Sequence, residues 1–112
     1  MKSSYIVCAG VALWCAAIVH ASAGEAVDAS IKLFQFQPKS IEVKAGTMIK
    51  WTNGDDIEHS VTAGAPGKES GGFDSGFFVK GGSFEQVFDK PGTYEYFCKR
   101  HNSMKGTVVV TE

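Results

Sequence analysis

The sequence predicts an all-β domain built as a Greek-key β-sandwich of about seven to eight strands. Three observations indicate this fold. After residue 23, apolar residues show almost no helical periodicity. Short β-favouring runs recur instead at intervals of roughly 8–12 residues, separated by Gly, Pro, Asn and Asp. Residues 24–112 are also enough for one small domain with its own core.

Three strands are predicted in the first half of this segment. Residues 29–36 alternate apolar and polar side chains, and Pro38 ends this strand or confines it to a sheet edge. Residues 40–43 and 47–52 form the next two strands. The turn signal Asn-Gly-Asp-Asp at 53–56 then closes the third strand.

The second half continues the pattern. Residues 58–63 form a predicted short strand that carries His59, and the Gly-rich residues 64–72 form a predicted loop. The aromatic residues within 73–79 are expected to pack partly on the core. Three further strands are predicted at residues 83–88, 93–98 and 106–111.

The N-terminus has the three-part pattern of a secretory signal peptide. Lys2 supplies the positive charge, residues 6–19 form an uncharged, mainly apolar run, and residues 21–23 (Ala-Ser-Ala) form a small-x-small cleavage site. A membrane anchor is the alternative, but the run is shorter than the roughly 20 residues that a span needs. We therefore expect residues 1–23 to be removed and the domain at 24–112 to be exported to the periplasm.

Charge and motif content exclude several classes of function. After residue 23 the chain has ten basic and twelve acidic residues, a formal net charge of −2. This near balance argues against a general nucleic-acid or anionic-membrane binder. No P-loop, dinucleotide fingerprint or G-x-S-x-G motif occurs. We expect a monomer with no nucleic-acid partner and no membrane span once the leader is removed.

Cys98 is the only cysteine after the predicted leader, which contains Cys8, Cys15 and His20. A single cysteine cannot form an internal disulfide, so it is an intermolecular bridge, a reactive thiol or a metal ligand. A free thiol is at risk of oxidation in an oxidising compartment. Metal ligation would protect the thiol, which favours the third interpretation.

Cys98 begins a Cys-x-x-His-x-x-Met motif that His101 and Met104 complete. Two His, one Cys and a weak axial Met are the ligands of blue-copper electron-transfer sites. The other histidine must come from elsewhere, and His59 is the only candidate after residue 23. Taken singly, each residue has an ordinary interpretation, because buried Cys and Met are common in cores and His on surfaces. Together, they predict a copper site formed by His59, Cys98, His101 and Met104.

These residues resemble the cupredoxins, the type 1 blue copper proteins, and within them the amicyanins and plastocyanin-like proteins. Downstream, the resemblance is carried by residues 91–98 (Pro-Gly-Thr-Tyr-Glu-Tyr-Phe-Cys), by His101 and Met104, and by 105–110. Upstream, it is carried by residues 46–53 and 59–61. It covers nearly all of the chain after the leader, and the gap between His101 and Met104 is similar to that of amicyanins.

The resemblance implies a cupredoxin-like sandwich that holds one copper ion and shuttles electrons without catalysing a reaction of its own. It also implies redox partners, such as a dehydrogenase donor and a c-type cytochrome or oxidase acceptor. His101 would lie near the surface among apolar residues, and His59 would be more enclosed.

The alternative function is a copper-binding or delivery protein of metal homeostasis, but the chain has too few Met for the open sites of such proteins. A copper enzyme would need further His clusters. A zinc protein is disfavoured because Met is not among the usual zinc ligands.

Four positions depart from the family pattern. The family usually has Asn after the first His and a small hydroxyl residue after the Cys, where this chain has Ser60 and Lys99. We expect the Ser60 hydroxyl to replace the Asn in part, and Lys99 not to supply the usual contact. Arg100 and Asn102 replace prolines that flank the second His in amicyanins, which predicts a less stiff and more polar loop. Lys99 and Arg100 are also expected to orient an acidic redox partner.

Overall fold

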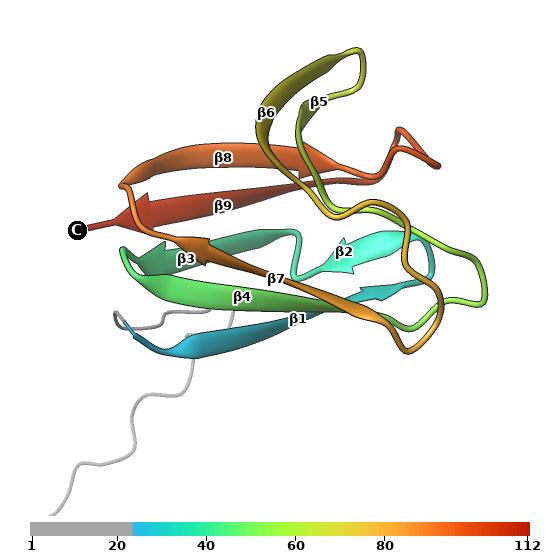
Figure 1. Ribbon diagram of the computed structural model, residues 1–112, viewed down its shortest axis with the longest axis horizontal. Coiled ribbons are helices and arrows are strands. Elements are labelled where there is room, and N and C mark those ends of the chain that lie inside the picture. The colour runs from blue at the N-terminus through green and yellow to red at the C-terminus, as the bar shows by residue number, and fades with distance from the viewer. Residues whose placement is uncertain (1–23) are drawn as a thin grey trace, which may run out of the picture.

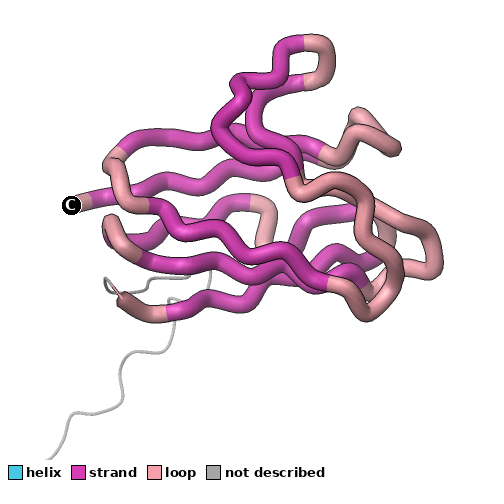
Figure 2. The backbone as a smooth tube through the Cα atoms, in the orientation of Figure 1, coloured by secondary structure: helices cyan, strands magenta, loops and turns pink. Residues whose placement is uncertain are grey.

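The computed structural model describes residues 24–112, so the predicted leader at 1–23 lies outside the described residues. Residues 24–112 form nine strands in two sheets and no helix (Figures 1 and 2). The strands are β1 (Ala26–Lys32), β2 (Gln35–Gln37), β3 (Ser40–Lys44), β4 (Thr47–Asn53), β5 (Thr62–Ala65), β6 (Lys68–Asp74), β7 (Ser83–Phe88), β8 (Gly92–Phe97) and β9 (Lys105–Thr111). The predicted all-β class is confirmed. Within this range no helix is long and apolar enough to span a membrane.

The two sheets pack face to face as the predicted sandwich. One sheet has the order β2-β1-β4-β7, and the other has the order β3-β9-β8-β5-β6. Parallel pairing of β1 with β4 and of β3 with β9 joins segments that are distant in the sequence. Along β4, alternate side chains point into the core, which is the period-two pattern of a strand with one buried face.

An aromatic cluster fills the core between the sheets. The Trp51 indole donates a hydrogen bond to the Tyr96 hydroxyl at 3.3 Å, and both side chains are almost fully buried. Burial raises the pKa of Tyr96 to about 12. Gly106 on β9 lies under the Tyr96 ring, where the Cβ of any other residue would collide with the ring. Tyr96 is thereby fixed two residues before Cys98.

The predicted strand at 29–36 is two strands separated by a turn. Leu33 and Phe34 adopt left-handed φ angles of 56° and 58°, which end β1 and reverse the chain into β2. Nothing local in the sequence signals this turn, because neither residue is Gly, Asn or Asp. Pro38 directly follows β2, which is an edge strand as expected.

The expectations for residues 58–63 and 64–72 are wrong. His59 precedes the strand and makes only an isolated bridge to Phe78, and β5 begins at Thr62. The expected loop at 64–72 is most of a hairpin formed by β5 and β6, which projects from the sandwich in Figure 1. The glycines of this segment interrupt the β-favouring runs that would indicate strands. Gly64, with a φ of 110°, lies at an irregularity of the pairing where a Cβ would collide with the backbone of β6.

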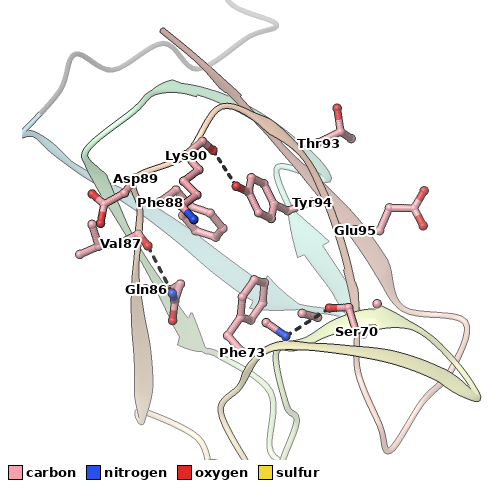
Figure 3. A pocket seen from close by; sticks show the side chains of 13 residues that line it. Ser70, Phe73, Gln86, Val87, Phe88, Asp89, Lys90, Thr93, Tyr94 and Glu95 are labelled. Atoms are coloured by element: carbon pink, nitrogen blue, oxygen red, sulfur yellow. Dashed lines mark hydrogen bonds between the residues drawn. The ribbon is translucent and has the colours of Figure 1, made fainter.

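A cleft of about 770 Å³ lies between this hairpin and strands β7 and β8 (Figure 3). Phe73, Phe88 and Tyr94 form its aromatic wall, and the Tyr94 hydroxyl donates a hydrogen bond to the Lys90 carbonyl at 2.6 Å. None of the four predicted copper ligands lines this cleft.

Candidate metal centre

The loops at the end of the sandwich opposite the C-terminus bring the predicted ligands together (Figure 1). His59 lies in the loop before β5, Cys98 directly follows β8, and His101 lies in the loop between β8 and β9. One ring nitrogen of each histidine and Cys98 Sγ all lie within 4.8 Å of one another. His59 Nδ1 is 3.6 Å from Cys98 Sγ. Three of the four predicted site residues therefore converge on one point.

Met104 belongs to the same tight loop. The Cys98 amide donates a hydrogen bond to the Met104 carbonyl at 3.1 Å, and the Met104 amide donates one to the His101 carbonyl at 2.9 Å. The Met104 side chain is buried in the core cluster that also contains Cys98. These two main-chain bonds close residues 98–104 into a short loop.

Asp55 fixes the imidazole of His59, which is fully buried. His59 Nε2 is 2.9 Å from Asp55 Oδ2. An ionised carboxylate only accepts hydrogen bonds, so the neutral imidazole carries its hydrogen on Nε2, and the lone pair on Nδ1 faces Cys98 Sγ. This is the tautomer that a metal at Nδ1 needs, with a carboxylate behind the ligand. This role of Asp55 was missed from the sequence, where the residue was identified only as part of a turn signal.

The same carboxylate holds the turn between β1 and β2. The Leu33 amide donates to Asp55 Oδ1 at 2.8 Å, and the Phe34 amide donates to Oδ2 at 2.9 Å. Burial by itself raises the pKa of Asp55, but the hydrogen bonds from Phe34, His59 and Leu33 outweigh it and lower this pKa overall. Asp55 thus stabilises two consecutive left-handed residues, a conformation that costs free energy.

Asn53 shapes the loop that carries Asp55 and His59. Its side-chain amide donates to the Ile57 carbonyl and to the Phe78 carbonyl, both at 2.9 Å. Its side-chain oxygen accepts a hydrogen bond from the Asp55 amide at 2.8 Å. Asn53 is 1% exposed, so these bonds form without competition from water. The turn signal in the sequence located this residue but not its contacts.

His101 differs from His59 in its surroundings. Its Nδ1 is buried and has no hydrogen-bond partner. An unpaired buried polar atom costs roughly 1–3 kcal/mol. A metal ion bound beside Cys98 Sγ would satisfy this nitrogen. Two imidazole nitrogens and a thiolate, with Met104 buried in the same cluster as Cys98, form a donor set that fits copper.

Phe34 packs against both histidine rings. Its ring centroid lies 4.8 Å from that of His101 and 5.6 Å from that of His59. Phe34 is 49% exposed and Leu33 is 72% exposed, so the turn that Asp55 holds places apolar surface next to His101. His101 is partly exposed whereas His59 is 0% exposed, which agrees with the expectation from the resemblance.

Ser60 links the two ligand-bearing loops. Its amide donates a hydrogen bond to Cys98 Sγ at 3.4 Å, and its hydroxyl accepts one from the Lys99 amide at 2.9 Å. The Ser60 hydroxyl therefore does connect the loops, as expected. The Lys99 side chain does not supply the usual contact between the loops, as expected, because it turns away to Asp74. The Lys99 main-chain amide makes such a contact instead, to the Ser60 hydroxyl.

The two cations beside His101 are paired rather than free. Lys99 Nζ is 2.6 Å from Asp74 Oδ2, and Arg100 is 3.6 Å from Glu58 Oε2. The hydrogen bond to Asp74 raises the pKa of Lys99. Each charge has a partly exposed carboxylate partner, which weakens its field toward solvent, and the expected role of both cations in orienting an acidic partner stays a prediction.

Comparison with known proteins identifies the family. The family described as copper binding proteins, plastocyanin/azurin family, matches residues 23–111. Amicyanin-alpha from Methylorubrum extorquens is 34% identical over 95 residues, which cover 84% of this chain and 78% of the relative. Plastocyanin from Scenedesmus fuscus is 32% identical over 83 residues, which cover 67% of this chain and 85% of the relative.

A solved structure agrees with these sequence matches. The purple cupredoxin from Nitrosopumilus maritimus superimposes with a TM-score of 0.70 and is 29% identical. The match covers 76% of this chain and 99% of that chain. The resemblance to cupredoxins and the prediction of copper as the cofactor are confirmed.

Proposed function

This chain belongs to the plastocyanin/azurin family of copper-binding proteins, and we propose that it carries single electrons between larger redox proteins. His59 Nδ1, Cys98 Sγ and His101 Nδ1 would hold the copper ion, and the Met104 thioether would complete the donor set. The close approach of one nitrogen of each histidine to Cys98 Sγ, together with a buried His101 Nδ1 that has no hydrogen-bond partner, carries this proposal. When bound, copper supplies a one-electron couple.

The chain's own contribution is to hold the donors in place before and after the electron moves. Asp55 keeps the hydrogen of His59 on Nε2, and the Ser60 amide stabilises negative charge on Cys98 Sγ. The main-chain bonds of residues 98–104 restrict the loop. Few groups therefore need to rearrange on electron transfer, which favours a fast carrier.

The partners reach the site at His101. Phe34 and Leu33 expose apolar surface there, and His101 is the ligand that is partly exposed. The partners are redox proteins such as a dehydrogenase donor and a c-type cytochrome or oxidase acceptor. Contact over this apolar surface would bring the edge of the His101 ring close to the partner and exclude water from the short path between them.

Copper delivery is the rival function. Delivery needs ready release of the ion, whereas His59 and Cys98 are 0% exposed and are anchored by hydrogen bonds. The site therefore favours retention. Slow transfer of copper to a competing chelator is the expected behaviour of a carrier, and rapid transfer would support delivery.

Export completes the proposal. Residues 1–23 serve as a signal peptide, and the copper domain at 24–112 acts in the periplasm. The apolar run before residue 20 and the small-x-small site at 21–23 support this assignment, and the family match begins at residue 23. N-terminal sequencing of protein secreted by the source cell would test it, and a retained residue 1 would contradict it.

Copper titration followed by visible spectroscopy tests the site. We expect an intense thiolate-to-copper band that saturates at one copper per chain, disappears on reduction and returns on oxidation. Cys98→Ser should abolish the band and Met104→Leu should shift it. Met48→Leu is the matched control and should leave the band unchanged, because Met48 lies half-buried on β4, where it pairs with Ala26 and Val87 and with none of the ligands. A colourless copper-loaded protein would contradict the proposal.

A further inference from the structure

A chain of hydrogen bonds leads from the ligand-bearing loops to Asp74 at the end of β6. The Lys99 amide donates to Ser60 Oγ at 2.9 Å, Ser60 Oγ lies 3.0 Å from Thr62 Oγ1, and Thr62 donates to Asp74 Oδ1 at 3.1 Å. A threonine hydroxyl has one hydrogen, and Thr62 gives it to Asp74. The Ser60 hydroxyl must therefore donate to Thr62. Every hydrogen in the chain points toward the carboxylate of Asp74.

The carboxylate that ends this chain is itself held on both oxygens. The Gly76 amide donates to Asp74 Oδ1 at 3.0 Å, and Lys99 Nζ lies 2.6 Å from Oδ2. Thr62 and Asp74 are also direct partners across β5 and β6. The interactions form a closed circuit that begins at the Lys99 amide and returns to the Lys99 ammonium. Asp74 is the only charged acceptor within it.

Ser60 joins this circuit to the copper site. Its amide donates to Cys98 Sγ at 3.4 Å, and its side chain is fixed on one side by Lys99 and on the other by Thr62. Ser60 and Thr62 are 0% and 1% exposed, so water cannot replace a lost partner. A change at Asp74 or Thr62 therefore reaches the Ser60 amide.

We propose that Asp74 is a positioning residue for the copper site, acting through the Thr62 and Ser60 hydroxyls to hold the Ser60 amide against Cys98 Sγ. The inference rests on the proposed function, because it assigns a role toward bound copper. It connects the site to the projecting β5–β6 hairpin, an element that carries no ligand of its own. Residues outside the ligand motif would thus help to set the reduction potential.

The direction in which the reduction potential shifts distinguishes the positioning role of Asp74 from a direct effect of its negative charge. An N–H donor withdraws electron density from a thiolate, which favours the reduced metal, so weakening the Ser60 amide bond should lower the reduction potential. Removing the negative charge of Asp74 by itself would disfavour the more positive oxidised site and raise the potential. Asp74→Asn should therefore lower the potential if positioning dominates. A raised potential would overturn the proposal.

Thr62→Val tests the circuit without changing any charge. It removes the hydroxyl between Ser60 and Asp74 and leaves the ion pair of Asp74 with Lys99. We expect a lowered potential in the copper-loaded protein, by up to about 59 mV, which is a tenfold change in a one-electron equilibrium constant. Thr62→Ser keeps a hydroxyl and should restore the wild-type value. Thr52→Val, a half-buried position on β4 in the other sheet, is the matched control and should cause no shift.

Amide hydrogen exchange in the metal-free protein gives a second readout that does not depend on copper. The Lys99 and Ser60 amides should exchange faster in Thr62→Val and in Asp74→Asn than in the wild type, and Thr52→Val should leave them unchanged. Unchanged exchange and unchanged potential in Thr62→Val would overturn the proposal. A wild-type protein that gives no copper band would instead contradict the proposed function, while the exchange rates would still test the circuit.

Discussion

Two loops supply the ligands, and different interactions hold them. The loop between β4 and β5, which carries His59, is anchored by the side chains of Asn53 and Asp55, which also bond to main-chain groups of other loops. The loop between β8 and β9, residues 98–104, is held by hydrogen bonds between its own main-chain groups and by two bonds to Ser60, one to Cys98 Sγ and one from the Lys99 amide. Its outer side chains make only partly exposed ion pairs.

The difference shows two ways of placing a metal ligand. The spacing within 98–104 keeps its three ligands close, so local sequence is enough. His59 depends on a carboxylate that also binds the Leu33 and Phe34 amides, 22 and 21 residues away. The first loop should therefore be sensitive to single side-chain changes, and the second should tolerate changes on its surface.

Asp55→Ala should break the first loop and have the largest effect. It removes the acceptor of bonds from His59 and from two main-chain amides, so we expect a loss of about 3 kcal/mol in the free energy of unfolding. Asp56→Ala is the matched control. Asp56 is 92% exposed and pairs only with Lys80, so its replacement should cost less than about 1 kcal/mol. Urea denaturation of the metal-free proteins measures both, and equal losses would contradict the role of Asp55 as the anchor of the first loop.

Replacing each histidine by glycine compares the two ligand positions directly. His101→Gly leaves a gap near the surface, whereas His59→Gly leaves an enclosed one, because His59 is 0% exposed. Added imidazole should therefore restore the visible band of His101→Gly at about a tenfold lower concentration, a difference of about 1.4 kcal/mol. Titration of both copper-loaded variants with imidazole provides the measurement. If both variants recovered the band at similar imidazole concentrations, His59 would not be a more enclosed ligand than His101.

A pH series tests the ion pair that joins Lys99 of the second loop to Asp74 on β6. The hydrogen bond from Lys99, followed by that from the Gly76 amide, lowers the pKa of Asp74 in the folded protein. A carboxyl whose pKa is lower when folded stabilises the protein above its unfolded pKa of about 3.9, and this contribution is lost as the pH falls through the folded value. The stability difference between wild type and Asp74→Asn should shrink below about pH 4. A stability difference that stays constant between neutral and acidic pH would argue against a stabilising role of the ionised Asp74 carboxylate.

Arg100→Ala should have the smallest effect. The distance of 3.6 Å to Glu58 and the partial exposure of both side chains predict a change within about 0.5 kcal/mol in the free energy of unfolding. The copper band should keep its position. A large loss of stability would mean that the surface of the second loop is as important as the buried anchors of the first.

The sequence predicted much of the second loop and little of what anchors the first. Cys98, His101 and Met104 form one local motif, so their proximity follows from their spacing. His59 was found by elimination, but Asp55 looked like a turn residue because two of its partners, the Leu33 and Phe34 amides, are distant in the sequence. A carboxylate four positions before a candidate histidine was the available signal.

The same physical reason explains the errors in the fold. Strands with a regular alternation of buried residues, such as β4 and β9, were predicted within a residue or two. The turn at Leu33 and Phe34 was missed because the distant Asp55 stabilises it, not its own residues. The β5–β6 hairpin was missed because glycine-rich strands gain their order from pairing, which no local pattern reveals.

Electron self-exchange between oxidised and reduced protein tests the central claim most directly. Line broadening in NMR spectra of mixtures of the two forms gives the rate. An electron carrier that docks at the His101 surface should exchange fast, and Phe34→Glu should slow the exchange by about tenfold or more, because two like charges would meet at the contact. Phe77→Glu is the control, since Phe77 is equally exposed at 49% and is not among the aromatic rings that pack on His59 or His101 in the described residues, and it should have little effect. Slow exchange in the wild type, or exchange that Phe34→Glu leaves unchanged, would contradict an electron carrier that acts through His101.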